Sequence, residues 1–156
     1  MKLYSTVASR LEAFTQMIGD LRSRRVPALC VGLSAIHKAH FLYAAAVELE
    51  EPVLVITQDE TSAARLVMDI NSMAASGEVA LLFPYRDFSY RQVEGVSTEY
   101  EQTRLSVLSR LAAGEASIVV ASMQAAMTRT IPKEVLLANT FSLSPGDAVS
   151  MEELAE

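Results

Sequence analysis

The sequence predicts an α/β fold in which a mostly parallel sheet is flanked by helices. Two observations predict this class. Short apolar runs of strand type alternate with helical patterns along the chain, and these runs are apolar on both faces, as buried parallel strands are. Hydrophobic residues make up 51% of the 156 residues and charged residues 21%, which is the composition of an ordinary globular domain.

The chain opens on an amphipathic pattern. Apolar residues recur at helical spacing from Leu3 to Leu21, so we expect one N-terminal helix, which ends before Pro27. The apolar run at 28–33 then predicts the first strand, and the stretch 35–50 predicts the helix that follows it.

Further strands and helices are expected downstream. Residues 53–57 are apolar and β-branched, which predicts a second strand, and the Thr57-x-x-Glu60 spacing of a capping box predicts the next helix start. The remaining elements are strands at 79–83 and 117–122, a helix from about 97 to Gly114 that is marked by Leu105, Leu108 and Leu111, short helices from Met123 and Pro132, and a fifth strand at 140–144.

These elements predict three parts: an N-terminal helix over 1–26, an α/β domain over 27–139, and the truncated start of an adjoining module over 140–156. The last part depends on the capping spacing from Ser150 to Glu153, after which too few residues remain for a stable helix. We therefore expect the chain to be a piece of a larger protein.

The stretch GLSAIHKAH, residues 32–40, lies at the expected turn from the first strand into its helix. A phosphate loop, G-x-x-x-x-G-K-[ST], lies in such a turn, binds phosphates through backbone N–H groups and binds Mg²⁺ through its hydroxyl. Gly32 and Lys38 fall in register with this pattern. His37 replaces the second glycine, where the loop needs no side chain, and Ala39 replaces the hydroxyl residue and cannot bind a metal ion.

A second requirement for hydrolysis of MgATP also fails. An acidic residue at the end of a neighbouring strand holds the metal, but the fourth strand ends in Ala121 and Ser122, and Asp59 and Glu60 lie in a capping pattern. We therefore predict a P-loop-NTPase-like fold with a degenerate phosphate loop, and expect no catalytic residue, cofactor or metal ion. The alternative is a nucleotide-binding or ATPase domain that uses Lys38.

Charge and cysteine content narrow the function classes. The formal net charge is −6, and the only dense basic run lies at 22–25, which disfavours direct binding to a nucleic-acid backbone. The single cysteine, Cys30, fits a reducing compartment. No apolar run approaches the ~18 residues of a membrane helix. We expect a cytoplasmic, monomeric fragment without a membrane partner.

The segment FPYRDFSYR, residues 83–91, interleaves aromatic and basic side chains. Tyr85, Arg86, Phe88 and Arg91 are the candidates for a surface that contacts a partner or another domain. In the simpler alternative, two aromatic rings fold back onto the sheet edge and the arginines pair with nearby acidic residues. Base stacking by the same aromatics is a third interpretation, which the net charge disfavours.

The chain resembles the N-terminal module of bacterial transcription-repair coupling factors, which is itself similar to the first domain of excinuclease component B. The likeness runs from about Pro27 to the C-terminus. It depends on GLS at the degenerate loop, PVLVIT, LLFPYRDFSYRQVEGVSTEYEQTRLSVLSRL, SIVVASMQAAMTRTIPKEV and FSLSPGDAVSMEELAE, of which the third is the most specific.

The resemblance implies a non-catalytic piece of a large ATP-driven DNA translocase that removes stalled RNA polymerase and recruits nucleotide excision repair. It implies that excinuclease component A binds through an adjoining module, and that RNA polymerase and DNA bind distant domains. Excinuclease component B carries a long DNA-clamping hairpin after its aromatic segment. Here only the eight residues 89 through 96 separate Phe88 from the expected helix start, so DNA clamping is not carried over.

Overall fold

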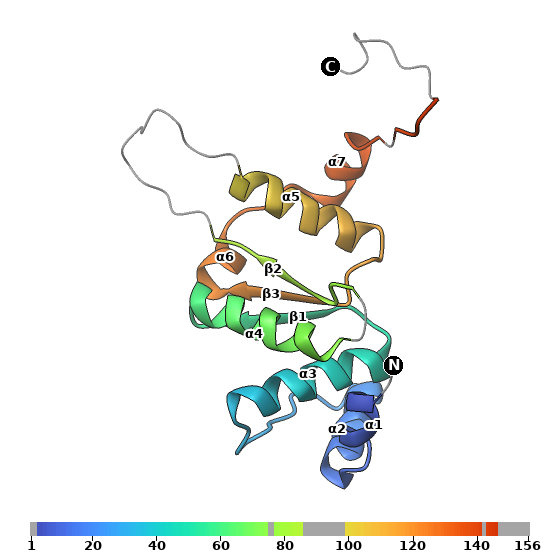
Figure 1. Ribbon diagram of the computed structural model, residues 1–156, viewed down its shortest axis with the longest axis vertical. Coiled ribbons are helices and arrows are strands. Elements are labelled where there is room, and N and C mark those ends of the chain that lie inside the picture. Colours follow the sequence, from blue (N-terminus) through green and yellow to red (C-terminus); the bar gives the residue numbers. More distant parts are fainter. Residues whose placement is uncertain (1–2, 75–76, 86–98, 142, 147–156) are drawn as a thin grey trace.

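The computed structural model describes residues 3–74, 77–85, 99–141 and 143–146, and this part of the chain holds seven helices and three strands (Figure 1). The alternation of strands and helices confirms the predicted α/β class. The elements in chain order are α1 (Leu3–Ala8), α2 (Glu12–Arg22), α3 (Ala35–Leu49), β1 (Val53–Thr57), α4 (Glu60–Met73), β2 (Ala80–Phe83), α5 (Glu99–Ala112), β3 (Ile118–Ser122), α6 (Met123–Met127) and α7 (Lys133–Ala138).

The three strands form one small parallel sheet in the order β1-β3-β2. Val120 at the centre of β3 lies beside Val55 of β1 and Leu82 of β2. Every residue of β3 is buried, whereas β1 alternates between half-buried and exposed positions. The strands predicted at 53–57, 79–83 and 117–122 are therefore confirmed, the latter two starting one residue later than expected.

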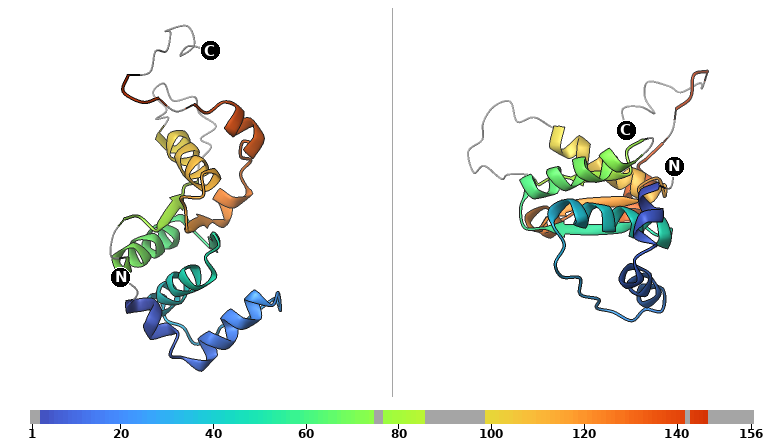
Figure 2. Two further views of the ribbon diagram at one scale, coloured as in Figure 1. Left: turned by 90° about the vertical axis from the view of Figure 1, so that its right-hand side faces the viewer. Right: turned by 60° about the horizontal axis from the view of Figure 1, so that its bottom comes forward.

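Helices cover the two faces of the sheet, as the two views in Figure 2 show. On one face α4 contacts all three strands and α3 packs against α4, around a core that includes Ala39, Ile70 and Ile118. On the other face α5 contacts β2, and α6 contacts β3 and β1, around a second core that includes Val107 and Val119.

The single N-terminal helix predicted from Leu3 to Leu21 is wrong, because the chain turns after Ala8 and forms α1 and α2. The Leu11 N–H donates to the Ala8 carbonyl at 2.9 Å, and the Thr15 hydroxyl donates to the Ser9 carbonyl at 3.2 Å. The turn lets both helices contact α3.

A third apolar cluster joins these helices to α3. Phe14 of α2 meets Phe41 of α3 edge-on, with ring centroids 5.2 Å apart. The Arg22 guanidinium donates to the Glu48 carbonyl near the end of α3. The N-terminal segment thus docks on α3 rather than on the sheet.

The strand predicted at 28–33 is also wrong. These residues form no strand, and the side chains of Leu29 and Val31 are 87% and 79% exposed. A strand requires a neighbouring strand for its backbone hydrogen bonds, and the segment runs along the outer side of α3, away from the sheet (Figures 1 and 2). The described residues of the expected fifth strand at 140–144 likewise form none, and Phe141 is 63% exposed.

Candidate functional site

The predicted phosphate-loop residues lie at the start of α3. Gly32 has the positive φ of 79°, which glycine adopts without strain. His37 and Lys38 are exposed, and His37 Nδ1 lies 3.1 Å from the Ser34 hydroxyl. Ala39 is fully buried and belongs to the core formed with α4 and the sheet.

Two features separate this turn from a phosphate loop. No strand leads into Gly32, although a strand-to-helix turn is the required context. Ala39, which stands where the metal-binding hydroxyl would be, faces the core. The arrangement does not confirm a P-loop-like fold, and the degenerate loop remains a prediction from the sequence.

A polar cluster lies instead at the carboxyl end of the sheet, the edge where ligands of open α/β sheets bind. Its centre is Glu60, in the first turn of α4. Glu60 Oε1 accepts a hydrogen bond from the Tyr85 N–H at 3.1 Å, and Oε2 accepts one from the Ser122 hydroxyl at 3.1 Å. Ser122 is fully buried, and its oxygen also caps α6 by accepting from the Ala125 N–H at 3.2 Å. Glu60 therefore joins the start of α4 to the ends of β2 and β3.

Arg104 of α5 completes the cluster and is only 8% exposed. Its Nη1 donates to the Pro84 carbonyl at 2.7 Å, and its guanidinium carbon lies 4.0 Å from the centre of the Phe83 ring. Its Nη2 is buried without a hydrogen-bond partner. Burial lowers the pKa of Arg104 from its usual value, and the negative charge of Glu60 opposes that shift.

The buried face of α5 does not follow the leucine spacing that marks the helix in the sequence. Leu105 and Leu111 are 45% and 40% exposed, while Arg104 and Val107 are buried and Leu108 is half-buried. Arg104 takes a buried position on α5 because its long side chain covers the Phe83 ring and donates a hydrogen bond to the Pro84 carbonyl.

The cluster holds the carboxyl ends of β2 and β3 against the start of α4. Its described members include no activated nucleophile. Both Glu60 oxygens accept hydrogen bonds from the protein, and its negative charge offsets that of Arg104. The sequence pattern assigned Glu60 only to a helix cap, and it neither singled out Arg104 nor gathered it with Ser122. The one available sign was that Ser122 and Glu60 each lie at or just after the end of an expected strand.

The capping box predicted at Thr57 is wrong, because Asp59 is the N-cap residue of α4. Asp59 accepts a hydrogen bond from the Ser62 N–H at 2.7 Å and another from its hydroxyl at 3.1 Å. The Thr57 hydroxyl instead donates to the Asp59 carbonyl at 2.9 Å. The backbone and side-chain hydrogen bonds from Ser62 lower the pKa of Asp59 below its usual value.

Asp59→Asn should make the chain less sensitive to acid. A carboxyl group whose pKa is lowered in the folded state stabilises the fold above its unfolded pKa of 3.8, and this contribution is lost as the pH falls through the folded pKa. Asparagine keeps the cap acceptor but does not titrate. Between about pH 6 and pH 3, urea unfolding should therefore show a smaller loss of stability for Asp59→Asn than for Asp69→Asn, a control later in the same helix. Equal losses would contradict the assigned cap.

Of the aromatic segment 83–91, the structure describes residues 83–85. Tyr85 is half-buried and packs against the core that lies under α5. Arg86, Phe88 and Arg91 lie outside the described residues. The partner surface that they were predicted to form stays a prediction.

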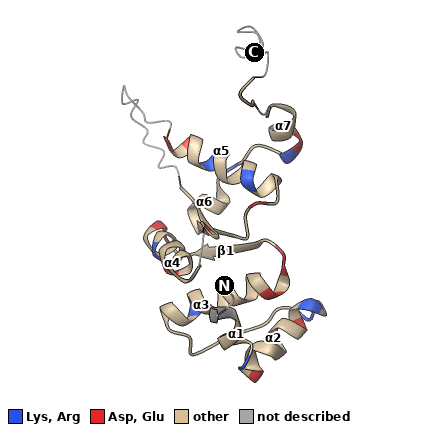
Figure 3. Ribbon diagram, turned by 45° about the vertical axis from the view of Figure 1, so that its right-hand side comes forward, with Lys and Arg blue, Asp and Glu red and all other residues tan. Residues whose placement is uncertain are grey.

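Within the described ranges, no three His, Cys, Asp or Glu side chains lie close enough together to hold a metal ion. No helix in that part of the chain is long and apolar enough to span a membrane. Along the ribbon of the described residues, acidic and basic positions are distributed over several helices and do not form one basic stripe (Figure 3).

The fold and site define an α/β domain with a small parallel sheet, whose carboxyl edge is closed by a polar cluster. No protein-family model and no solved structure matches the chain. Among curated proteins, the chain is similar to the transcription-repair-coupling factor of Bacillus subtilis (strain 168), with 29% identity over 150 residues. The match covers 96% of this chain but 13% of that protein, so the likeness is to a region of a coupling factor.

Proposed function

We propose that this chain is the N-terminal module of a transcription-repair coupling factor, the module similar to excinuclease component B, and acts as a non-catalytic scaffold in transcription-coupled nucleotide excision repair. The observation that carries the proposal is the 29% identity to the Bacillus subtilis protein, which extends over 96% of the chain rather than over one motif. The scaffold role goes beyond what the name of that relative states.

Two local features support a role without ATP hydrolysis. Ala39 is buried at the position where a phosphate loop presents its metal-binding hydroxyl. At the carboxyl end of the sheet, both Glu60 oxygens accept hydrogen bonds from the protein itself, which gives this carboxylate a structural role there. In the proposed role, excinuclease component A binds an adjoining module, while RNA polymerase and DNA bind other domains of a cytoplasmic coupling factor.

A domain exchange tests this role. The matching region of the Bacillus subtilis coupling factor is replaced by this chain or deleted, and both proteins are compared for DNA-stimulated ATP hydrolysis and for strand-selective removal of ultraviolet lesions. We expect the exchange to retain both activities, and the deletion to retain ATP hydrolysis and lose strand-selective repair. Loss of ATP hydrolysis on deletion, in a protein that remains folded, would contradict a non-catalytic role.

The alternative is nucleotide binding through Lys38, and the observation that favours it is that the Lys38 side chain is exposed at the start of α3. A site with a Kd near 50 μM would add about 2.7 kcal/mol of stability in about 5 mM MgATP, or roughly 5–10 °C in Tm for a domain of this size. We expect no such shift in a thermal unfolding assay. A shift of that size that disappears in Lys38→Ala would establish the alternative.

A further inference from the structure

Within the described residues, β1 pairs only with β3, and no strand there pairs with the edge of β1 that faces away from β3, which we call the open edge. The Val53 N–H donates to the Ser117 carbonyl at 2.9 Å, so the backbone groups of Val53 and of alternate residues after it point toward β3. The backbone groups of Leu54 and Ile56 therefore point away from β3, and no strand in the described part of the chain pairs with them.

The side chains at this edge are apolar and exposed. Leu54 lies beside Val119 and Ile56 lies beside Ala121, so all four share one face of the sheet. Val119 and Ala121 are 6% and 1% exposed, but Leu54 and Ile56 are 63% and 49% exposed. On this face, therefore, α6 covers β1 only in part and leaves the side chains of Leu54 and Ile56 exposed.

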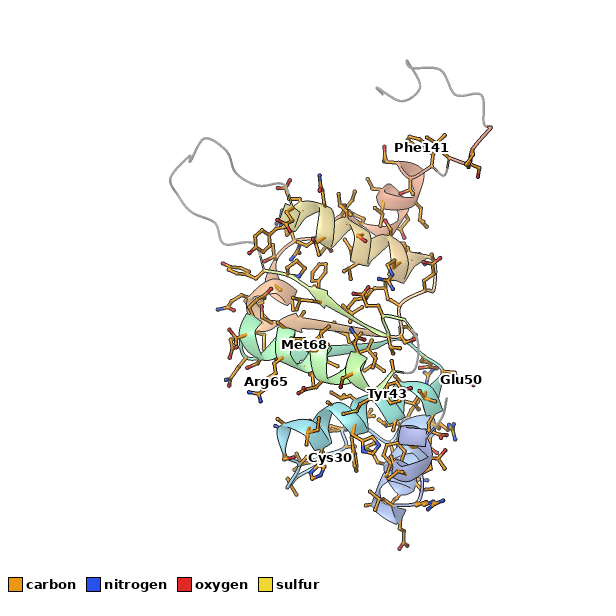
Figure 4. The ribbon with its side chains drawn as sticks, in the orientation of Figure 1. Cys30, Tyr43, Glu50, Arg65, Met68 and Phe141 are labelled. Atoms are coloured by element: carbon orange, nitrogen blue, oxygen red, sulfur yellow. The ribbon has the colours of Figure 1, made fainter. Side chains whose placement is uncertain are left out.

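The chain segment that carries this edge is acidic. Residues 41–64 contain five Asp and Glu and no Lys or Arg, and one of the five, Glu48, pairs with Arg22 of α2 at 3.8 Å. Glu50 and Glu51 are exposed and are separated from the strand by Pro52 alone, and Glu50 lies where α3 leads into β1 (Figure 4). A second copy of the chain would bring the same negative charges to the edge: in an antiparallel pair centred on Val55, Glu51 would face the partner's Asp59. Like charges opposite one another destabilise such a pairing.

We propose that the open edge of β1 binds an extended segment of a partner protein, with apolar residues at its centre and Lys or Arg at its ends, which adds to the sheet as a fourth strand. The N–H and C=O groups of Leu54 and Ile56 supply the main-chain hydrogen bonds. Apolar side chains of the segment cover Leu54 and Ile56, and its basic ends approach Glu50 and Glu51. This surface is separate from the repair role proposed above and does not depend on it.

A synthetic peptide tests the proposal. The probe is a fluorescein-labelled peptide with three Val alternating with two Thr and two Lys at each end; a peptide with proline at the central Val is the control, because proline cannot donate to the ladder. Binding to the 156-residue chain is followed by fluorescence anisotropy, and amide hydrogen exchange is measured with and without peptide.

We expect saturable binding that protects the Leu54 and Ile56 amides from exchange. The affinity should fall at least about tenfold in Ile56→Lys, which adds charge to the apolar edge, and remain unchanged in Met68→Lys, a matched change at an exposed residue of α4 (Figure 4). Glu51→Lys, which lies outside the strand, should weaken binding and reduce its dependence on salt.

Three results would overturn the proposal. They are equal binding of the probe and its proline control, equal losses in Ile56→Lys and Met68→Lys, and protection of amides away from β1. Sedimentation of the chain as a concentration-dependent dimer, with the Leu54 and Ile56 amides protected without peptide, would show that a second copy occupies the edge instead.

Discussion

Replacing Glu60 with alanine should lower the free energy of unfolding by about 3 kcal/mol. The change removes the acceptor for the Tyr85 N–H and for the hydroxyl of fully buried Ser122. It also removes the negative charge that favours the charged form of buried Arg104. In the unfolded chain the Tyr85 N–H and the Ser122 hydroxyl bind water. In the folded variant they would have no acceptor in place of Glu60, and this loss is the cost of the substitution.

A double-mutant cycle separates these contributions. In the Glu60→Ala background, Arg104→Met should cost less than in the native chain, because methionine fills a similar volume and no longer places an unbalanced charge in the core. Glu60→Gln should be milder than Glu60→Ala, since its amide oxygen still accepts one hydrogen bond. Urea denaturation of the four proteins of the cycle gives the coupling energy directly. Additive effects of the two substitutions would mean that Glu60 and Arg104 do not act as a unit.

The core strands could be predicted from the sequence because buried parallel strands need continuous apolar runs, and 53–57, 79–83 and 117–122 have them. The run at 28–33 has a similar apolar composition and forms no strand. Composition predicts which segments can form strands, but a strand also needs an edge to pair with, and this depends on where α3 packs. The sequence pattern of 28–33 carries no information about that docking.

The polar cluster was harder to predict for a related reason. Glu60 and Ser122 are 62 residues apart in the chain, and Arg104 and Pro84 are 20 apart, so no local spacing brings them together. An arginine in the middle of an amphipathic helix normally indicates the solvated face. Here the helix rotates so that Arg104 lies over Phe83, which depends on the tertiary contact and could not be predicted from the helix alone.

Ile70→Ala should lower the free energy of unfolding by about 4 kcal/mol, and with it the Tm by roughly 10 °C. The exposed fraction of Ile70 is 0%, and its side chain packs in the core that joins α4 to α3 and to β3. Truncation to alanine removes most of the side chain from this core, and the rigid sheet beneath α4 limits how far the space can close.

Met68→Ala is the matched control, because Met68 lies on the same helix and is 72% exposed. Its loss should stay within about 0.5 kcal/mol, so the two variants should differ by several degrees in Tm in the same thermal unfolding assay. Similar losses in both variants would show that α4 does not present this face to the sheet. The position assigned to Glu60 would then also be wrong, because Glu60 reaches β2 and β3 only when Ile70, on the same helix, faces the core.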